Sequence, residues 1–230
     1  MKRRLFMAQS GIGLVMAVAL FTGSAAFAQQ QQTDFARAQQ ENARALRNYN
    51  WKSRTEVRKG GETKSTKLYL TRYAADGSLH QTLISESSQS IPKFGLRGLI
   101  ARKKKEDFVE LLGDLGALAK SYGNLPADRM QRFMAGATKT PEATPQARLL
   151  RIEGRDVLQP GDSMTVWVDA ATRRQRRVEV QTTFEGKPVS IVSEFRDLPN
   201  GPTYVARSVI GYADKELSVV TDNFGHARER

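Results

Sequence analysis

The stretch QRRVEVQTTFE, residues 175–185, alternates apolar and polar side chains with a period of two. Val178, Val180 and Phe184 share one face of such an extended segment, and charged or polar residues occupy the other. A period of two predicts a β-strand, and one apolar face is typical of an antiparallel sheet that is buried on one side. Glu185-Gly186-Lys187 follows as a tight turn, so the next strand should fold back on this one.

Further predicted strands, separated by turns, lie on both sides of this stretch. From Ala147 to the end, turns separate six predicted strands, at 147–157, 163–170, 175–185, 188–197, 203–212 and 216–224. Three more precede them, at 49–57, 65–73 and 79–86, with an Asp76-Gly77 hairpin turn between the last two. About nine consecutive antiparallel strands favour a curved half-barrel, because a flat sheet would expose one apolar face.

Residues 92–144 interrupt the strands with a helical pattern. Apolar residues recur there at helical spacing: Phe108, Leu111, Leu112, Leu115, Leu118 and Tyr122. A second short helix should begin near Ala127, and 138–146, with two prolines, is predicted to be a loop. A further helix is expected over 33–48. The fold class is therefore mainly β with α, with the helical insertion serving as a lid or a plug for the sheet.

The N-terminus has the three parts of a secretory signal. Lys2, Arg3 and Arg4 precede an apolar run centred on 11–21, and Ala26-Phe27-Ala28 fits a cleavage site. We expect residues 1–28 to be removed and 29–230 to form a single periplasmic domain of about 200 residues. The chain has no cysteine, which excludes a disulfide and a lipid anchor on a lipobox cysteine.

The sequence offers no catalytic motif, metal site or cofactor motif. His80 and His226 are predicted to be surface residues, without acidic partners at ligand spacing. A carboxylate pair of the glycosidase kind is not favoured, because the acidic residues between 153 and 169 fall at turns and on exposed strand faces. We therefore expect a non-enzymatic protein, a monomer without a cofactor.

Basic residues predict an anionic partner. The formal net charge is +12, and for an exported protein this favours lipid head groups or an anionic membrane surface over nucleic acid. One predicted hairpin carries four candidate anion contacts: Arg173, Arg174, Arg176 and Arg177. Protection of the sheet edge against aggregation explains them as well. A second basic cluster, 102–105, is predicted to end the loop that leads into the helical pair.

The order of helix, strands, helical insertion and strands behind a signal peptide resembles the LolA/LolB-like superfamily of periplasmic lipoprotein carriers. The likeness rests on the helix-to-strand entry Leu46–Trp51 and on two closing segments, Val166–Asp169 and Phe195–Pro199. The resemblance implies an incomplete barrel, closed by helices over a hydrophobic cavity that takes acyl chains.

We therefore expect a carrier or binding protein for a lipid or another amphiphilic ligand, held between the sheet and the helices. The candidate lining residues are Trp51, Tyr69, Leu111, Leu115, Met130, Phe133, Trp167 and Phe184. Two alternatives stay open at this point. One is an envelope interaction or sensing module with a filled core, and the other is a hydrolase with an unrecognised site.

Overall fold

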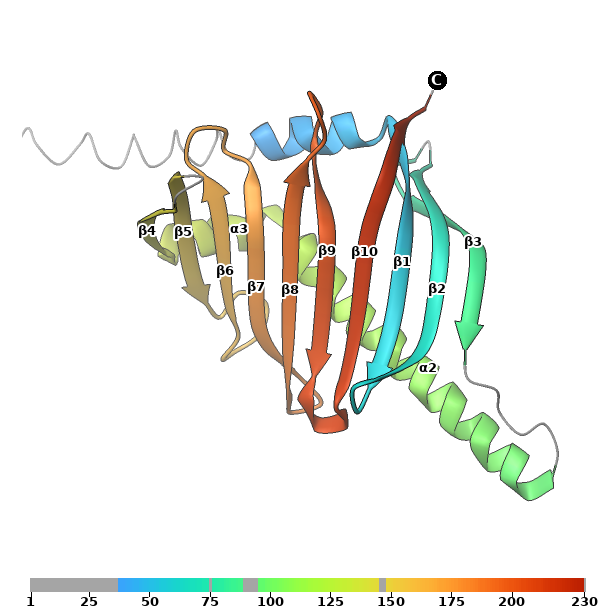
Figure 1. Ribbon diagram of the computed structural model, residues 1–230. Coiled ribbons are helices and arrows are strands. Elements are labelled where there is room, and N and C mark those ends of the chain that lie inside the picture. The colour runs from blue at the N-terminus through green and yellow to red at the C-terminus, as the bar shows by residue number, and fades with distance from the viewer. Residues whose placement is uncertain (1–36, 75, 89–94, 145–147, 230) are drawn as a thin grey trace, which may run out of the picture.

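The computed structural model describes residues 37–74, 76–88, 95–144 and 148–229, so the predicted signal peptide lies outside the described residues. Within these ranges ten strands form one antiparallel sheet (Figure 1). The strands are β1 (Tyr49–Lys59), β2 (Glu62–Tyr73), β3 (Leu79–Ser88), β4 (Thr138–Ala143), β5 (Arg148–Arg155), β6 (Ser163–Asp169), β7 (Gln175–Phe184), β8 (Lys187–Asp197), β9 (Thr203–Tyr212) and β10 (Leu217–Arg228).

The first and last strands lie side by side at the centre of the sheet. Its order is β3-β2-β1-β10-β9-β8-β7-β6-β5-β4, and the register of the central pair joins Val57 to Val219. The N-terminal and C-terminal runs of strands are thereby joined into one curved sheet with edges at β3 and β4 (Figure 1). The predicted fold class, a mainly β half-barrel with helices, is confirmed.

The prediction of a loop over 138–146 is wrong, because residues 138–143 form the edge strand β4. Pro141 pairs with Leu150 of β5, and every residue of β4 is exposed. An edge strand tolerates proline because one side of its backbone has no neighbour that needs the missing N–H. Without an apolar alternation the segment gave no strand signal, and the predicted nine strands are ten.

Helix α2 (Gly95–Gly123) connects the two opposite edges of the sheet through the short helix α3 (Ala127–Gly136). Its 29 residues span about 43 Å. The nine spacings between ten strands also sum to roughly 43 Å if the sheet is flat. The curved sheet is narrower than this, and the first turns of α2 extend past β2 and β3 (Figure 1).

The basic cluster 102–105 therefore lies inside α2 and does not end a loop, which corrects the prediction. The stripe that begins at Phe108 marks where the helix meets the sheet. Lys103, Lys104 and Lys105 are exposed.

The hydrophobic core lies between the helices and one face of the sheet, called here the inner face. Val166, Val180 and Ile191 from the strands are at most 5% exposed and belong to one cluster with Leu115 of α2, which is 1% exposed. The stripe predicted from sequence therefore packs on the sheet. Among the described residues no helix is long and apolar enough to cross a membrane.

Gly154 on β5 lets α3 approach the sheet closely. A Cβ atom at this position would lie 2.8 Å from two ring carbons of Phe133, which is itself buried. We expect Gly154→Val to lower the free energy of unfolding by about 1–3 kcal/mol, because the ring has no free space to move into. Urea denaturation measures this, with Gly116→Ala as the control, since a Cβ atom there meets nothing within 4 Å. Equal losses in both variants would contradict the close approach of α3.

Candidate functional site

A cavity of about 760 Å³ lies on the inner face of the sheet. Its floor is apolar and comes from β6, β7 and β8, with Met164, Val166, Val178, Val180 and Ile191. The end of α2 and the start of α3 form one wall, and helix 37–46 forms another. Helix 37–46 lies across the strand ends at one end of the sheet (Figure 1). The cavity thus lies beside the packed middle of α2, where Leu111 and Leu115 fill the interior.

Asn42 fixes helix 37–46 to the turn between β8 and β9. Its side-chain Nδ2 donates to the carbonyl oxygen of Thr203 at 2.8 Å, and its Oδ1 accepts from the Thr203 backbone N–H at 2.6 Å. Thr203 is 4% exposed, so the Thr203 side of both hydrogen bonds is shielded from water. This two-point attachment holds the wall of the cavity in place.

Tyr122 and Asp162 attach the other wall to the sheet. The Tyr122 hydroxyl donates to Asp162 Oδ2 at 2.5 Å and lies 2.7 Å from Thr182 Oγ1 on β7. Burial, followed by the hydrogen bond to the carboxylate, raises the pKa of Tyr122. The phenol is therefore a neutral donor at physiological pH, with its ring on the cavity wall.

Asp162 also organises the loop between β5 and β6. It is 2% exposed and accepts backbone N–H bonds from Val157 at 2.6 Å, Leu158 at 2.9 Å and Gln159 at 3.0 Å. Burial opposes its charged form, but the hydrogen bonds from Tyr122 and from these three N–H groups outweigh it and lower the pKa of Asp162. The expectation of a turn-forming role is met, although the carboxylate is buried and not solvated.

An aromatic cluster lies beside the cavity on β1 and β10. Trp51 stacks on His226 with ring centroids 5.6 Å apart, and His226 lies 4.0 Å from the Tyr204 ring. The prediction that His226 is a surface residue in a C-terminal tail is wrong, because β10 continues to Arg228 and half-buries the imidazole. Burial lowers the pKa of His226. His80 is exposed on β3, as predicted.

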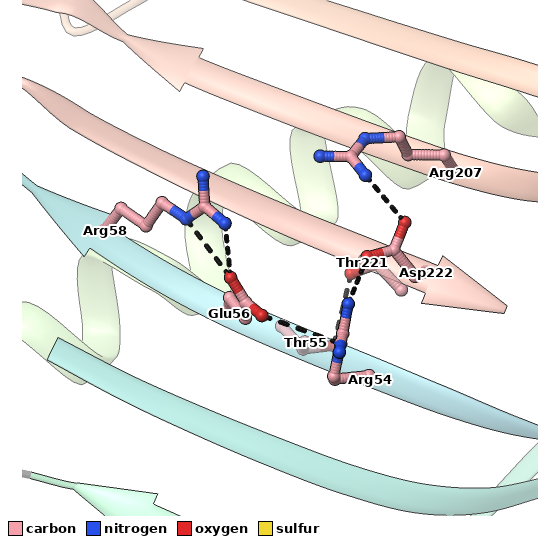
Figure 2. Close-up of polar contacts among 7 residues, drawn as sticks. All are labelled: Arg54, Thr55, Glu56, Arg58, Arg207, Thr221 and Asp222. Carbon is pink, nitrogen blue, oxygen red and sulfur yellow. Dashed lines mark hydrogen bonds and ion pairs between the residues drawn. The ribbon is translucent and has the colours of Figure 1, made fainter. Parts of the chain in front are cut away.

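The outer face of the sheet carries a chain of ion pairs across β1, β10 and β9. Figure 2 shows a chain of charges in which Glu56 pairs with Arg58 at 2.5 Å and with Arg54 at 3.5 Å. Asp222 continues it, at 3.3 Å from Arg54 and 3.0 Å from Arg207. Exposed ion pairs contribute little to stability, but they keep this face solvated.

The eight predicted lining residues fall into several environments. Met130 lines the cavity. Leu111, Leu115 and Phe133 are buried in the hydrophobic core, and Phe184 packs against that core with its ring edge-on to Tyr212. Contact of any of these residues with a ligand stays a prediction.

The remaining three do not line this cavity either, so Met130 is the one predicted lining residue that does. Trp51 belongs to the aromatic cluster, and Tyr69 is half-buried on β2. Trp167 lies on the outer face, because Val166 and Val168 take the inner positions of β6, and its indole N–H donates to Glu142 at 3.1 Å.

Of the four predicted anion contacts, Arg173 and Arg174 line the cavity, whereas Arg176 and Arg177 do not. The sequence reasoning did not assign helix 37–46 to the site, although Ala38, Asn42 and Ala45 line it. The available signal was the small apolar face of this helix, which needs a partner surface.

Comparisons with known proteins identify neighbours of the fold only. No protein-family model matches the sequence, and no curated protein matches it significantly. The chain is similar to a DUF1329 family protein from Desulfovibrio piger, with 9% identity, 87% of this chain and 92% of that chain covered, and a TM-score of 0.42.

Two further solved structures are similar. One is a putative outer membrane lipoprotein-sorting protein domain from Vibrio parahaemolyticus, with 10% identity, coverage of 87% and 93%, and a TM-score of 0.41. The other is a LolA superfamily protein from Nitrosomonas europaea, with 14% identity, coverage of 84% and 93%, and a TM-score of 0.36. One of these neighbours is thus described under the name of that superfamily. The likeness is one of overall arrangement, and no ligand is inferred from it.

Proposed function

We propose that the protein is exported and binds a lipid or another amphiphilic ligand, without catalysis, in the cavity between helix 37–46, the α2–α3 junction and the inner face of the sheet. The observation that carries the proposal is the cavity itself. Its volume of about 760 Å³ lies within the range of roughly 300–1,000 Å³ that is usual for small-molecule sites.

The lining of the cavity has an apolar part and a charged part, as the binding of an amphiphile requires. Valine, isoleucine and methionine side chains of β6, β7, β8 and α3 offer an apolar surface, while arginines of the β6–β7 turn and of β10 lie in the same cavity. Burying a hydrocarbon chain on such a floor gains about 0.8 kcal/mol per CH₂ group.

The two alternatives find less support in these residues. Among the described residues Glu41 is the one carboxylate that lines the cavity, and no Ser–His pair converges on it, so neither a carboxylate pair nor a nucleophile is in place for hydrolysis. The alternative of an interaction or sensing module requires a filled core, and the interior is filled only beneath the middle of α2.

Filling the cavity tests the proposal. Ala119 lies on the wall formed by α2, whereas Ala117 on the same helix is exposed. We expect Ala119→Trp to weaken binding of the neutral fluorophore N-phenyl-1-naphthylamine at least fivefold, because the indole occupies the space of the ligand. Fluorescence titration measures this loss, and native mass spectrometry of protein from the periplasm should show less co-purified lipid.

Ala117→Trp is the matched control and should bind like the parent protein. Thermal unfolding of both variants verifies that the fold is retained. Unchanged binding by a folded Ala119→Trp variant, or no binding by the parent protein, would refute the proposed function.

A further inference from the structure

Three of the four arginines in the β6–β7 hairpin are neutralised by carboxylates. Arg174 pairs with Asp197 at 3.2 Å, and Arg176 pairs with the same carboxylate at 2.8 Å and with Asp169 at 3.5 Å. Arg177 contacts Glu179 at 2.6 Å and Glu194 at 3.2 Å. These three positive charges therefore have partners within the protein and are not needed to bind an external anion.

Arg173 is the exception. No carboxylate of the described chain lies within ion-pair distance of it, and it lines the cavity. Its backbone has a φ of +60° and donates its N–H to the carbonyl oxygen of Asp169 at 2.9 Å. The turn is fixed further by the Asp169 carboxylate, which accepts the backbone N–H groups of Ala171 and Thr172 at 3.0 and 2.9 Å. A rigid turn therefore holds Arg173 at the cavity without a carboxylate partner among the described residues.

A second cation, Arg228, lines the same cavity and forms no ion pair with a described residue. Arg228 ends β10 and pairs in register with Tyr49 of β1, so it lies at the end of the sheet where the β6–β7 turn and helix 37–46 are found (Figure 1). Glu41 of helix 37–46 is the one acidic lining residue among those described, and it is exposed. The unpaired charges of the lining are thus two positive and one negative, which favours an anion at this end.

We propose that the ligand is an anionic amphiphile, whose phosphate or carboxylate group binds Arg173, at the end of the cavity where Arg228 adds a second positive charge, while its hydrocarbon chain lies on the floor formed by β6, β7 and β8. This inference rests on the proposed function and specifies the substrate class of the same cavity. A guanidinium presents a planar set of N–H donors that fits both oxyanions, and charge-assisted hydrogen bonds of this kind are stronger than neutral ones.

The test compares ligands that share a dodecyl chain and differ in the head group. Dodecyl phosphate, dodecanoate, dodecyl glycerol ether and dodecyltrimethylammonium each compete with N-phenyl-1-naphthylamine for the full mature chain. We expect the two anions to bind at least tenfold more tightly than the neutral ether, and the cation to bind most weakly. The ratio of the affinities for dodecyl phosphate and dodecanoate identifies which oxyanion the site prefers.

Arg173→Gln should reduce the preference for anions at least fivefold and leave the affinity for the neutral ether unchanged. Arg177→Gln is the matched control, since it removes the same charge from the same hairpin on the outer face, and it should keep the preference. Equal binding of anionic and neutral ligands by the parent protein, or a preference that survives in Arg173→Gln, would overturn this inference alone. Failure of every dodecyl ligand to bind would overturn the proposed function together with it.

Discussion

Leu115→Arg is expected to destabilise the protein by about 4 kcal/mol or more, which is a large part of the 5–15 kcal/mol that holds an ordinary domain together. Leu115 is 1% exposed and lies in the core cluster that joins α2 to the inner face of the sheet. The substitution removes an apolar side chain from that cluster and places a charge there without a partner, and each change is costly. Urea denaturation followed by circular dichroism measures the loss.

Val109→Arg provides the comparison on the same helix. Val109 is 57% exposed, so an arginine there should change the free energy of unfolding by no more than about 0.5 kcal/mol. If Leu115→Arg fails to fold, the milder Leu115→Ala should still lose about 2–5 kcal/mol while it keeps a measurable transition. Similar unfolding midpoints for Leu115→Ala and the parent protein would show that the apolar stripe of α2 does not pack on the sheet.

Periodicity predicted the elements that bury one face. The stripe through Leu111 and Leu115 and the alternation of Val178 and Val180 both arise from burial on one side, and both appear in the core. Strand β4 was missed because it is exposed along its whole length, so its sequence carries no such alternation. The start of α2 was placed too late because the exposed lysines 103–105 interrupt the apolar pattern before Phe108.

The site was harder to predict because it depends on contacts between distant segments. The cavity brings helix 37–46 next to turns more than 100 residues away, and Asn42 contacts Thr203 across that separation. The hairpin arginines look equivalent in sequence. Only the folded chain brings Asp197 to Arg174 and Arg176, and it leaves Arg173 without a carboxylate partner among the described residues. The local pattern therefore located the cationic hairpin but not its one cavity-lining arginine without a described carboxylate partner.

Asp162→Asn is expected to lower the free energy of unfolding by about 2–4 kcal/mol. Both carboxylate oxygens are acceptors, Oδ1 for Val157 N–H and Oδ2 for Leu158 N–H, Gln159 N–H and the Tyr122 hydroxyl. An amide turns one of these oxygens into an NH₂ group that faces donors, so at least one buried N–H or O–H loses its partner. Because the Tyr122 hydroxyl loses its charged acceptor, the end of α2 should exchange its amide hydrogens faster than in the parent protein.

Asp156→Asn is the matched control, since Asp156 lies in the same loop but is exposed, and it should cost no more than about 0.5 kcal/mol.

The pH dependence of stability separates the effect of the Asp162 charge from the effect of its hydrogen-bonding shape. The folded-state pKa of Asp162 is lowered, so the stability that its charge supplies is fully present above the unfolded value of about 3.9 and is lost as the pH falls through the folded-state value. The difference in unfolding free energy between the parent protein and Asp162→Asn should therefore be constant from pH 5 to 8 and shrink below about pH 4. A difference that stays the same down to pH 2 would mean that the carboxylate charge does not hold α2 to the sheet, and that the hydrogen-bonding shape of the side chain does.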